Sequence, residues 1–464
     1  MRFILSCVHS TRYAAALAVI LPTFATTVAA QTPSNAVPVP DFLNPHPNPL
    51  RFPTQAEEVT IQRTQSITLT QALELAKRNN RSLQQAILDL ERSRAALREA
   101  QAVFAPNVTV SGNLNNRGDG FTGTGASSTT SVSGQVQVSY ELFTSGARVR
   151  ASEEQLRIDE LNVENRSSEI RLNVTLQYYN LQAADEEVRI NQSAVENAQA
   201  SFRDAEARLR FGVGTRFDVL QAQVNLANAQ QQLTNALSQQ QIVRREMARL
   251  LNLAQSVDVS AADPVEIAGL WEPTLEQSIV QALQNRPELQ QVLARRNIAE
   301  QQRRIAISNI RPQVGLTANY NVIDQFNDGS SLTDGYSLGL RASLTLFDGG
   351  AAKARAAQSQ INMAIAENQF ARERDDIRFN VEQFYAQLQS NLDNIQTSTV
   401  GLDQAREALR LARLRFEAGV GTQTDVIFAE NDLTRAEGNR VTAILNYNRA
   451  LANLQRTVSL TSVK

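Results

Sequence analysis

Hydrophobic residues recur at every seventh position along two long stretches of the chain. They are Val174, Leu181, Val188, Val195, Phe202 and Leu209 in the first stretch, and Val381, Leu388, Ile395, Leu402, Leu409 and Phe416 in the second. Further along each stretch, alanine occupies alternate seam positions: Ala222, Ala229, Ala236, Ala429, Ala436 and Ala443. A strict seven-residue period forces a left-handed supercoil, and alanine in the seam lets helices approach closely. The pattern predicts two antiparallel coiled hairpins, with long helices over 147–211 and 350–416 and return helices over 216–253 and 423–460.

Each hairpin is expected to turn at a glycine-containing tip, over 212–215 in the first and 417–422 in the second. Glycines in both tips are expected to supply the positive φ that ends a helix. These are Gly212, Gly214, Gly419 and Gly421. A threonine then acts as N-cap, and an aspartate three residues later completes a capping box. The pairs are Thr215 with Asp218 and Thr422 with Asp425.

Four further segments alternate apolar and polar residues. They cover 106–114, 131–143, 312–323 and 336–347. Alternation with period two is typical of a strand with one apolar and one polar face, and over about ten residues it is also typical of a transmembrane β-strand. A stretch rich in glycine, serine and threonine, 115–130, is expected to be the loop between the first two strands.

The second half of the chain repeats the plan of the first. Two shorter helices, expected over 69–79 and 82–104, precede the first pair of strands, and the same order of elements follows later in the chain. We therefore expect a first structural repeat over 67–253, a linker over 254–273 and a second repeat over 274–464.

The N-terminal region is expected to contribute little to the core. Residues 1–30 have the basic start, apolar run and small-residue end of a secretory signal peptide. Residues 31–66 form a proline-rich arm, which we expect to be extended and poorly packed. The only cysteine, Cys7, lies in the signal peptide, and the one remaining histidine, His46, lies in the arm. No catalytic residue, cofactor or metal site is therefore expected.

Charge and strand number constrain the partners. The chain carries 45 basic and 47 acidic residues, so its charge gives no reason to expect a nucleic acid partner. No run after the signal peptide reaches the ~18 apolar residues of a transmembrane helix.

The number of strands indicates that several chains assemble. Four strands cannot close a barrel, which needs about eight, and an open sheet edge is not tolerated in hydrocarbon. Several chains are expected to share one barrel, of eight strands for two chains or twelve for three.

The chain resembles the TolC family of outer membrane efflux proteins. The resemblance covers residues 67–460 and rests on the duplicated helix–strand–strand–helix plan, the long helices, and the paired Gly-Val-Gly-Thr tips followed by Asp-Val. It implies a mainly α fold with a transmembrane β-barrel part. A homotrimer would form a twelve-stranded barrel in the lipid of the outer membrane and a coiled-coil α-barrel through the periplasm. It also implies export through docking to a periplasmic adaptor and an inner-membrane pump, either ABC or proton-driven, with small molecules or proteins as cargo.

The tips are the candidate functional sites. Residues expected to dock to the adaptor are Val213, Gly214, Thr215, Val420, Gly421 and Thr422. Asp218 and Asp425 are expected to place carboxylates around the tunnel mouth and favour cations, and the alternative is that they serve only as caps. By the resemblance, Phe416 takes the place of a gate tyrosine and has no hydroxyl to bond Asp218. The gate arginine position falls on Gly421 or Gln423, so the family's latch cannot form in the same way.

The alternative function is that of a periplasmic adaptor, which also contains a long coiled-coil hairpin. An adaptor would show one hairpin flanked by lipoyl-like β segments and no duplication, whereas this sequence predicts two hairpins and no such segments. A hydrolase is disfavoured because no cysteine remains and the single histidine lies in the proline-rich arm. A passive porin has no such helices.

Overall fold

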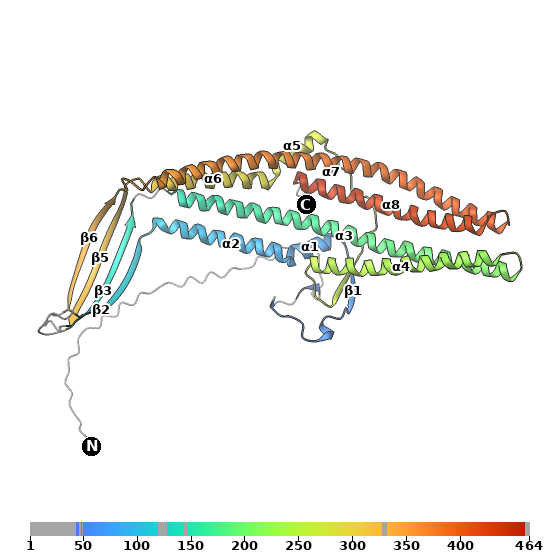
Figure 1. The fold of residues 1–464 in the computed structure, drawn as a ribbon, viewed down its shortest axis with the longest axis horizontal. Helices are drawn as coiled ribbons and strands as arrows, with labels where there is room; N and C mark the ends of the chain where they lie inside the picture. The colour runs from blue at the N-terminus through green and yellow to red at the C-terminus, as the bar shows by residue number, and fades with distance from the viewer. Residues whose placement is uncertain are drawn as a thin grey trace, which may run out of the picture. The chain divides into compact units, whose positions relative to one another are not determined.

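A computed structural model of the protein describes residues 43–45, 48, 50–118, 128–142, 146–326 and 332–459. The predicted signal peptide and His46 lie outside these residues. Residues Val39–Lys464 form one compact unit. Within this unit, two hairpins of long helices lie side by side and continue into one four-stranded sheet (Figure 1).

The same order of helices occurs twice. The first set is α1 (Leu69–Asn79), α2 (Arg81–Gln101), α3 (Ala147–Arg210) and α4 (Arg216–Leu250). The second set is α5 (Leu275–Asn285), α6 (Pro287–Ser308), α7 (Ala351–Glu417) and α8 (Gln423–Val458). The long helix α3 contacts α2 and α4 of its own set, and also α6 and α8 of the other. None of the helices described is both long enough and apolar enough to cross a membrane.

The heptad positions form the seams of the two hairpins, as predicted. Val174 and Leu181 on α3 are fully buried. Nearer the tips, Val195 packs with Ala229 between α3 and α4, and Leu409 packs with Val426 between α7 and α8. Small alanine side chains at these positions let the paired helices approach closely along their length.

The sheet has one continuous apolar face. Its strands are β2 (Asn107–Gly118), β3 (Ser128–Glu141), β5 (Gln313–Phe326) and β6 (Thr333–Ser343), in the order β2-β3-β5-β6 and all antiparallel. The register places Val136 opposite Val110 on one side and opposite Tyr320 on the other, and Tyr320 is opposite Tyr336. Side chains directly opposite in a sheet share a face. The predicted alternation is therefore confirmed across all four strands.

The strand boundaries differ from those predicted. Residues 115–118 and 128–130, assigned to the loop, continue the ladder of β2 and β3, for example through Asn115 opposite Ser131. The ladder is made by backbone groups, so it runs on through polar residues that carry no hydrophobic signal. In the second half, β5 extends to Phe326 and β6 ends at Ser343.

The proline-rich arm contributes to the core, contrary to the prediction that it packs poorly. Leu43 is only 1% exposed and joins the core cluster that contains Ile67 and Val259. Strand β1 (Arg63–Ile67) pairs in parallel with β4 (Val257–Ala261), which lies in the predicted linker. The hydroxyl oxygen of Tyr178 on α3 lies 3.0 Å from the carbonyl oxygen of Ile67, so the long helix holds this small sheet in place. Two short 3-10 helices, η2 (Ala56–Glu58) and η3 (Ala102–Phe104), complete the description.

Candidate functional site

Both hairpins turn through the same backbone geometry. After α3, Gly212 has φ 75°, and the N–H groups of Val213 and Gly214 donate to the carbonyl oxygen of Arg208 at 3.0 and 3.1 Å. After α7, Gly419 has φ 72°, and two consecutive N–H groups donate in the same way to the carbonyl oxygen of Arg415. These bonds satisfy carbonyl groups that the end of a helix leaves free.

Only one glycine in each tip has a positive φ. The sequence predicts it at all four tip glycines, and this is wrong for Gly214 and Gly421. At Gly214 a Cβ atom would lie 2.9 Å from the Cβ of Arg208, and at Gly421 it would lie 3.0 Å from the backbone nitrogen of Phe416. These two glycines are required because the turn folds closely onto the last helical turn. A bulky replacement there is expected to distort the turn itself.

The capping boxes form as predicted. Asp218 Oδ2 accepts from the backbone nitrogen of Thr215 at 3.0 Å, and the backbone nitrogen of Asp218 donates to Thr215 Oγ1 at 3.1 Å. The equivalent bonds join Asp425 and Thr422 at 2.9 and 3.2 Å. The backbone N–H of Thr422 stabilises the carboxylate and holds the pKa of Asp425 below its usual value. Asp425 is therefore ionised at neutral pH, and its side chain is exposed to solvent.

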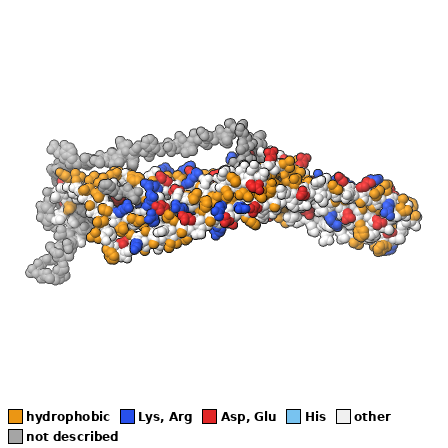
Figure 2. Space-filling view, turned by 90° about the horizontal axis from the view of Figure 1, so that it is seen from above, with side chains coloured by type: hydrophobic (Ala, Val, Ile, Leu, Met, Phe, Trp, Pro, Cys, Tyr) orange, Lys and Arg blue, Asp and Glu red, His pale blue; other side chains and the backbone are white. Residues whose placement is uncertain are grey.

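Exposed apolar side chains gather at the two tips. Val213 is 73% exposed and Val420 is 70% exposed, and two aromatic side chains, Phe211 at 83% and Phe217 at 70%, extend this surface. Figure 2 shows hydrophobic side chains at the end of the molecule opposite the sheet. The sequence prediction identified the valines but missed the two phenylalanines, whose hydrophobicity at a predicted turn was the available signal.

A contact between the two hairpins involves Phe416. The guanidinium carbon of Arg208 lies 4.0 Å from the centroid of the Phe416 ring, and Arg208 Nη2 donates to the carbonyl oxygen of Phe416 at 2.9 Å. A cation over an aromatic face is attracted by the ring quadrupole. Phe416 thus joins the end of α7 to the end of α3 without a hydroxyl group. The sequence prediction missed Arg208, because the contact depends on how the two hairpins align.

A second group of contacts joins the hairpins further from the tips. Glu430 on α8 is 5% exposed, and its Oε1 accepts from Ser201 Oγ on α3 at 2.7 Å and from Arg413 Nη2 on α7 at 3.1 Å. Between the first contact and this one, Thr424 Oγ1 lies 3.1 Å from Gln221 Oε1. Beside Glu430 lies a cavity of about 630 Å³ that is lined by residues of α3, α4 and α8. Among the described residues, no three potential metal ligands come together.

Comparison with known proteins identifies similar chains. A family model described as outer membrane efflux protein matches residues 72–253 and 278–458. Outer membrane efflux protein BepC of Brucella suis is 24% identical over 382 residues, which are 82% of each chain. Protein CyaE of Bordetella pertussis is 27% identical over 393 residues, covering 82% of this chain and 81% of that one. The crystal structure of the outer membrane protein VceC from Vibrio cholerae aligns with a TM-score of 0.71 at 18% identity, covering 84% of this chain and 95% of that one.

Proposed function

Because the chain belongs to the outer membrane efflux protein family, we propose that three copies assemble into one export channel. The observation that carries this proposal is the two-faced sheet, which has an exposed apolar face and an unpaired outer edge on each of its end strands, β2 and β6. A sheet edge in hydrocarbon must be paired, and four strands are too few to close on themselves. In a trimer, β6 of each copy pairs with β2 of the next, and twelve strands close the barrel. The helical hairpins of the three copies then surround a periplasmic tunnel.

The tips are proposed to dock to a periplasmic adaptor that links the channel to an inner-membrane pump, either ABC or proton-driven. Val213 and Val420 support this proposal, since they expose apolar surface at the end of the tunnel furthest from the sheet. Exposed apolar surface of this kind marks an interaction site. The proposed docking surface also includes Gly214, Thr215, Gly421 and Thr422, which lie beside these valines in the two turns.

Light scattering on the detergent-solubilised protein tests the trimer. The expected protein mass is three times that of one processed chain, and the same preparation should form channels in a planar bilayer. A dimer of eight strands, or a monomer that conducts ions by itself, would show that the proposed assembly is wrong.

Two neighbouring positions on β3 provide a matched pair of variants for the same test. Val136→Arg places a charge on the apolar face, at a cost of ~2–4 kcal/mol if the residue lies near the bilayer centre. Gln137→Arg places the same charge on the polar face, which lines the barrel interior in the proposed assembly. We expect Val136→Arg to reduce the amount of trimer in the outer membrane and Gln137→Arg to leave it unchanged.

Asp218 and Asp425 are proposed to make the channel cation-selective. A trimer would gather six of these carboxylates around one axis, where they attract cations to the mouth. Asparagine still accepts a hydrogen bond at a capping position, so Asp218→Asn combined with Asp425→Asn removes charge and preserves the turns. We expect this double variant to lose most of the cation preference measured by reversal potentials under a salt gradient. Asp432→Asn, on α8 beyond the tip, is the control.

The pH dependence of this selectivity follows from the lowered pKa of Asp425. Its usual value is 3.8, and a group whose pKa is lowered by folding stays charged below that value. The carboxylate charge and the capping stability that it provides are therefore complete above pH 3.8 and are lost as the pH falls through the lower, folded-state pKa.

The double variant Asp218→Asn with Asp425→Asn also distinguishes the alternative. A cation preference that is unchanged in the folded double variant would mean that both aspartates act only as caps.

A further inference from the structure

Basic side chains without acidic partners gather on the helical ends that adjoin the sheet. They are Arg98 on α2, Arg148 and Arg150 on α3, Arg311 after α6, and Lys353 and Arg355 on α7. All six are exposed, and within the described ranges none of them takes part in an ion pair. We call these six residues the basic collar. Figure 2 shows Lys and Arg side chains on this part of the surface, next to the hydrophobic side chains of the strand end.

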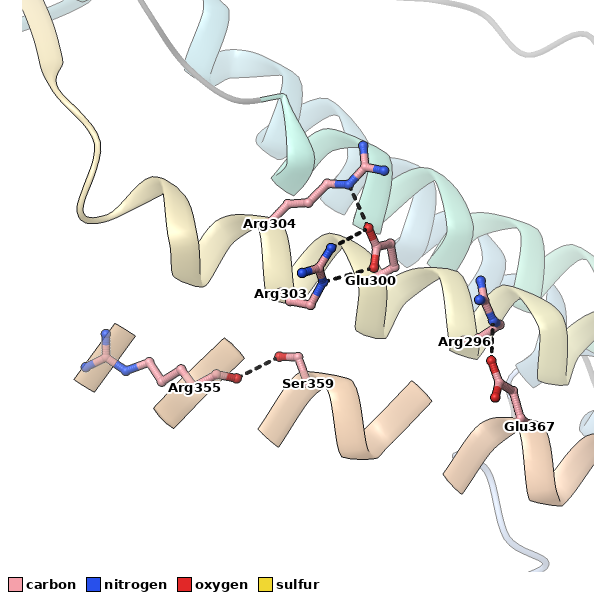
Figure 3. A network of polar contacts seen from close by, with 7 residues as sticks. All are labelled: Arg296, Glu300, Arg303, Arg304, Arg355, Ser359 and Glu367. Carbon is pink, nitrogen blue, oxygen red and sulfur yellow. Dashed lines mark hydrogen bonds and ion pairs between the residues drawn. The ribbon is translucent and has the colours of Figure 1, made fainter. Parts of the chain in front are cut away.

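Neighbouring charges in the same region are paired, which sets the collar apart. On α6, Glu300 accepts from Arg303 Nε at 3.2 Å and from Arg304 Nε at 3.0 Å. Figure 3 shows the guanidinium group of Arg355 pointing away from this cluster. The only contact drawn for Arg355 is made by its carbonyl oxygen, which accepts from Ser359 Oγ at 3.0 Å. The region thus contains carboxylates, but they do not neutralise the collar.

Two collar residues place positive charge at the N-terminus of α3, which is the positive end of its dipole. This helix begins at Ala147 with no side-chain cap and no acidic residue in its first turn, where Arg148 and Arg150 lie instead. The N-terminus of a helix carries partial positive charge, so cations there are unfavourable. At the tip, by contrast, α4 begins with Asp218 in its first turn. An anion bound from outside the chain would relieve the repulsion at the start of α3.

Both repeats carry basic residues at matching positions. Lys353 lies 205 positions after Arg148, and Arg355 lies 205 positions after Arg150. On α7 one carboxylate, Asp348, precedes them and accepts from the backbone nitrogen of Ala352 at 2.7 Å. Two residues separated by one position project about 200° apart around a helix. The two cations of each pair therefore lie on different sides of their helix.

Exposed apolar side chains lie between the sheet and the collar residues of α2 and α7. In the connection between β6 and α7, Leu344 is 51%, Leu346 89% and Phe347 86% exposed, and Phe104 at the end of α2 is 48% exposed. Aromatic residues and long basic side chains are enriched where a membrane meets water. From β6 to α7, the order along the chain is apolar strand face, exposed apolar and aromatic residues, then unpaired cations. This is the order expected at a membrane interface.

On the basis of the function proposed above, we propose that the basic collar binds the anionic headgroups of phospholipids in the leaflet that faces the periplasm. The charge complementarity is direct, because each guanidinium or ammonium group can donate to a headgroup phosphate. The collar lies on the helical side of the sheet, which is the periplasmic side in the proposed assembly. Bound lipids would hold the barrel at a fixed depth.

Thermal unfolding of the purified full-length protein in detergent, titrated with phosphatidylglycerol, tests the proposal. Phosphatidylethanolamine and inorganic phosphate are the comparison ligands. The collar variant combines four changes: Arg148→Gln, Arg150→Gln, Lys353→Gln and Arg355→Gln. The control variant neutralises four exposed arginines far from the sheet: Arg203→Gln, Arg210→Gln, Arg216→Gln and Arg372→Gln.

The expected effect follows from the number of charges removed. Each basic group near an anionic surface contributes roughly a fivefold factor in affinity. We expect the collar variant to need at least ~10-fold more phosphatidylglycerol for the same rise in unfolding midpoint.

The outcomes separate the proposal from its alternatives. Equal responses to phosphatidylglycerol in the collar and control variants overturn it, and an equal effect of inorganic phosphate shows a phosphate site instead of a lipid surface. Without lipid, the collar variant should unfold no earlier than the unsubstituted protein, since its changes remove charges that oppose a helix dipole. Charge-preserving changes, Arg148→Lys with Arg150→Lys, should keep the lipid response. A wrong assembly is detected separately, by the mass from light scattering.

Discussion

Replacing Arg208 with alanine is expected to open the tips of the channel and to increase its conductance in a planar bilayer. In each chain, Arg208 holds the end of α3 to the end of α7 through the ring and the carbonyl oxygen of Phe416. A cation–π contact and one charge-assisted hydrogen bond on a half-exposed side chain together contribute about 2 kcal/mol. Losing them shifts the ratio of separated to joined hairpins by roughly 30-fold in each chain.

Two further variants make this prediction specific. Arg210→Ala removes an exposed arginine two residues later and should leave the conductance unchanged. Phe416→Leu removes the ring but keeps the carbonyl acceptor, so its effect should be intermediate. If Arg208→Ala and Arg210→Ala conduct alike in folded trimers, the contact between α3 and α7 does not hold the channel closed.

Replacing Val213 and Val420 with aspartate is expected to abolish export while leaving the channel assembled. Each valine contributes roughly 1.5–3 kcal/mol when fully buried in an interface, and an unpaired carboxylate in its place adds a desolvation cost. The affinity for the adaptor should therefore fall by more than ~100-fold. Both side chains are exposed and sit in turns held by backbone bonds, so folding should be unaffected.

The measurements are cellular export and pull-down of the adaptor, compared at equal amounts of trimer in the outer membrane. Val224→Asp changes a valine on α4 that is 60% exposed, and it should retain export. Normal export and adaptor binding by the double variant would place docking elsewhere on the molecule.

The hairpins and their tips were predictable because their signals are local. Seven-residue periodicity and a threonine followed by aspartate each specify structure within a few turns of the chain. The different roles of the two tip glycines were not predictable. Gly212 has a positive φ, whereas the site of Gly214 leaves no room for a Cβ atom, and both conditions select glycine. The contact of Arg208 with Phe416 depends on the alignment of two hairpins, which no periodicity within either hairpin determines.

The small parallel sheet shows a different limit. β1 and β4 have five residues each and are far apart in the sequence, so each is too short to give a distinct pattern. The burial of Leu43 follows from the core that these strands help to form. A composition rich in proline indicates an extended backbone, but it does not determine whether a single leucine packs against the core.

The pairing of β3 with β5 bears on the order in which the parts of the chain fold and assemble. The whole first hairpin lies between these two strands in the sequence, so folding of α3 and α4 back on each other shortens the distance that the chain must close before the strands meet. Closing so long a stretch of chain is entropically costly and slow. The helices have core clusters of their own, whereas in the proposed trimer the outer edges of β2 and β6 stay unpaired until other copies bind. In the proposed trimer, barrel closure is therefore expected to be a late step whose rate rises with the concentration of folded chains.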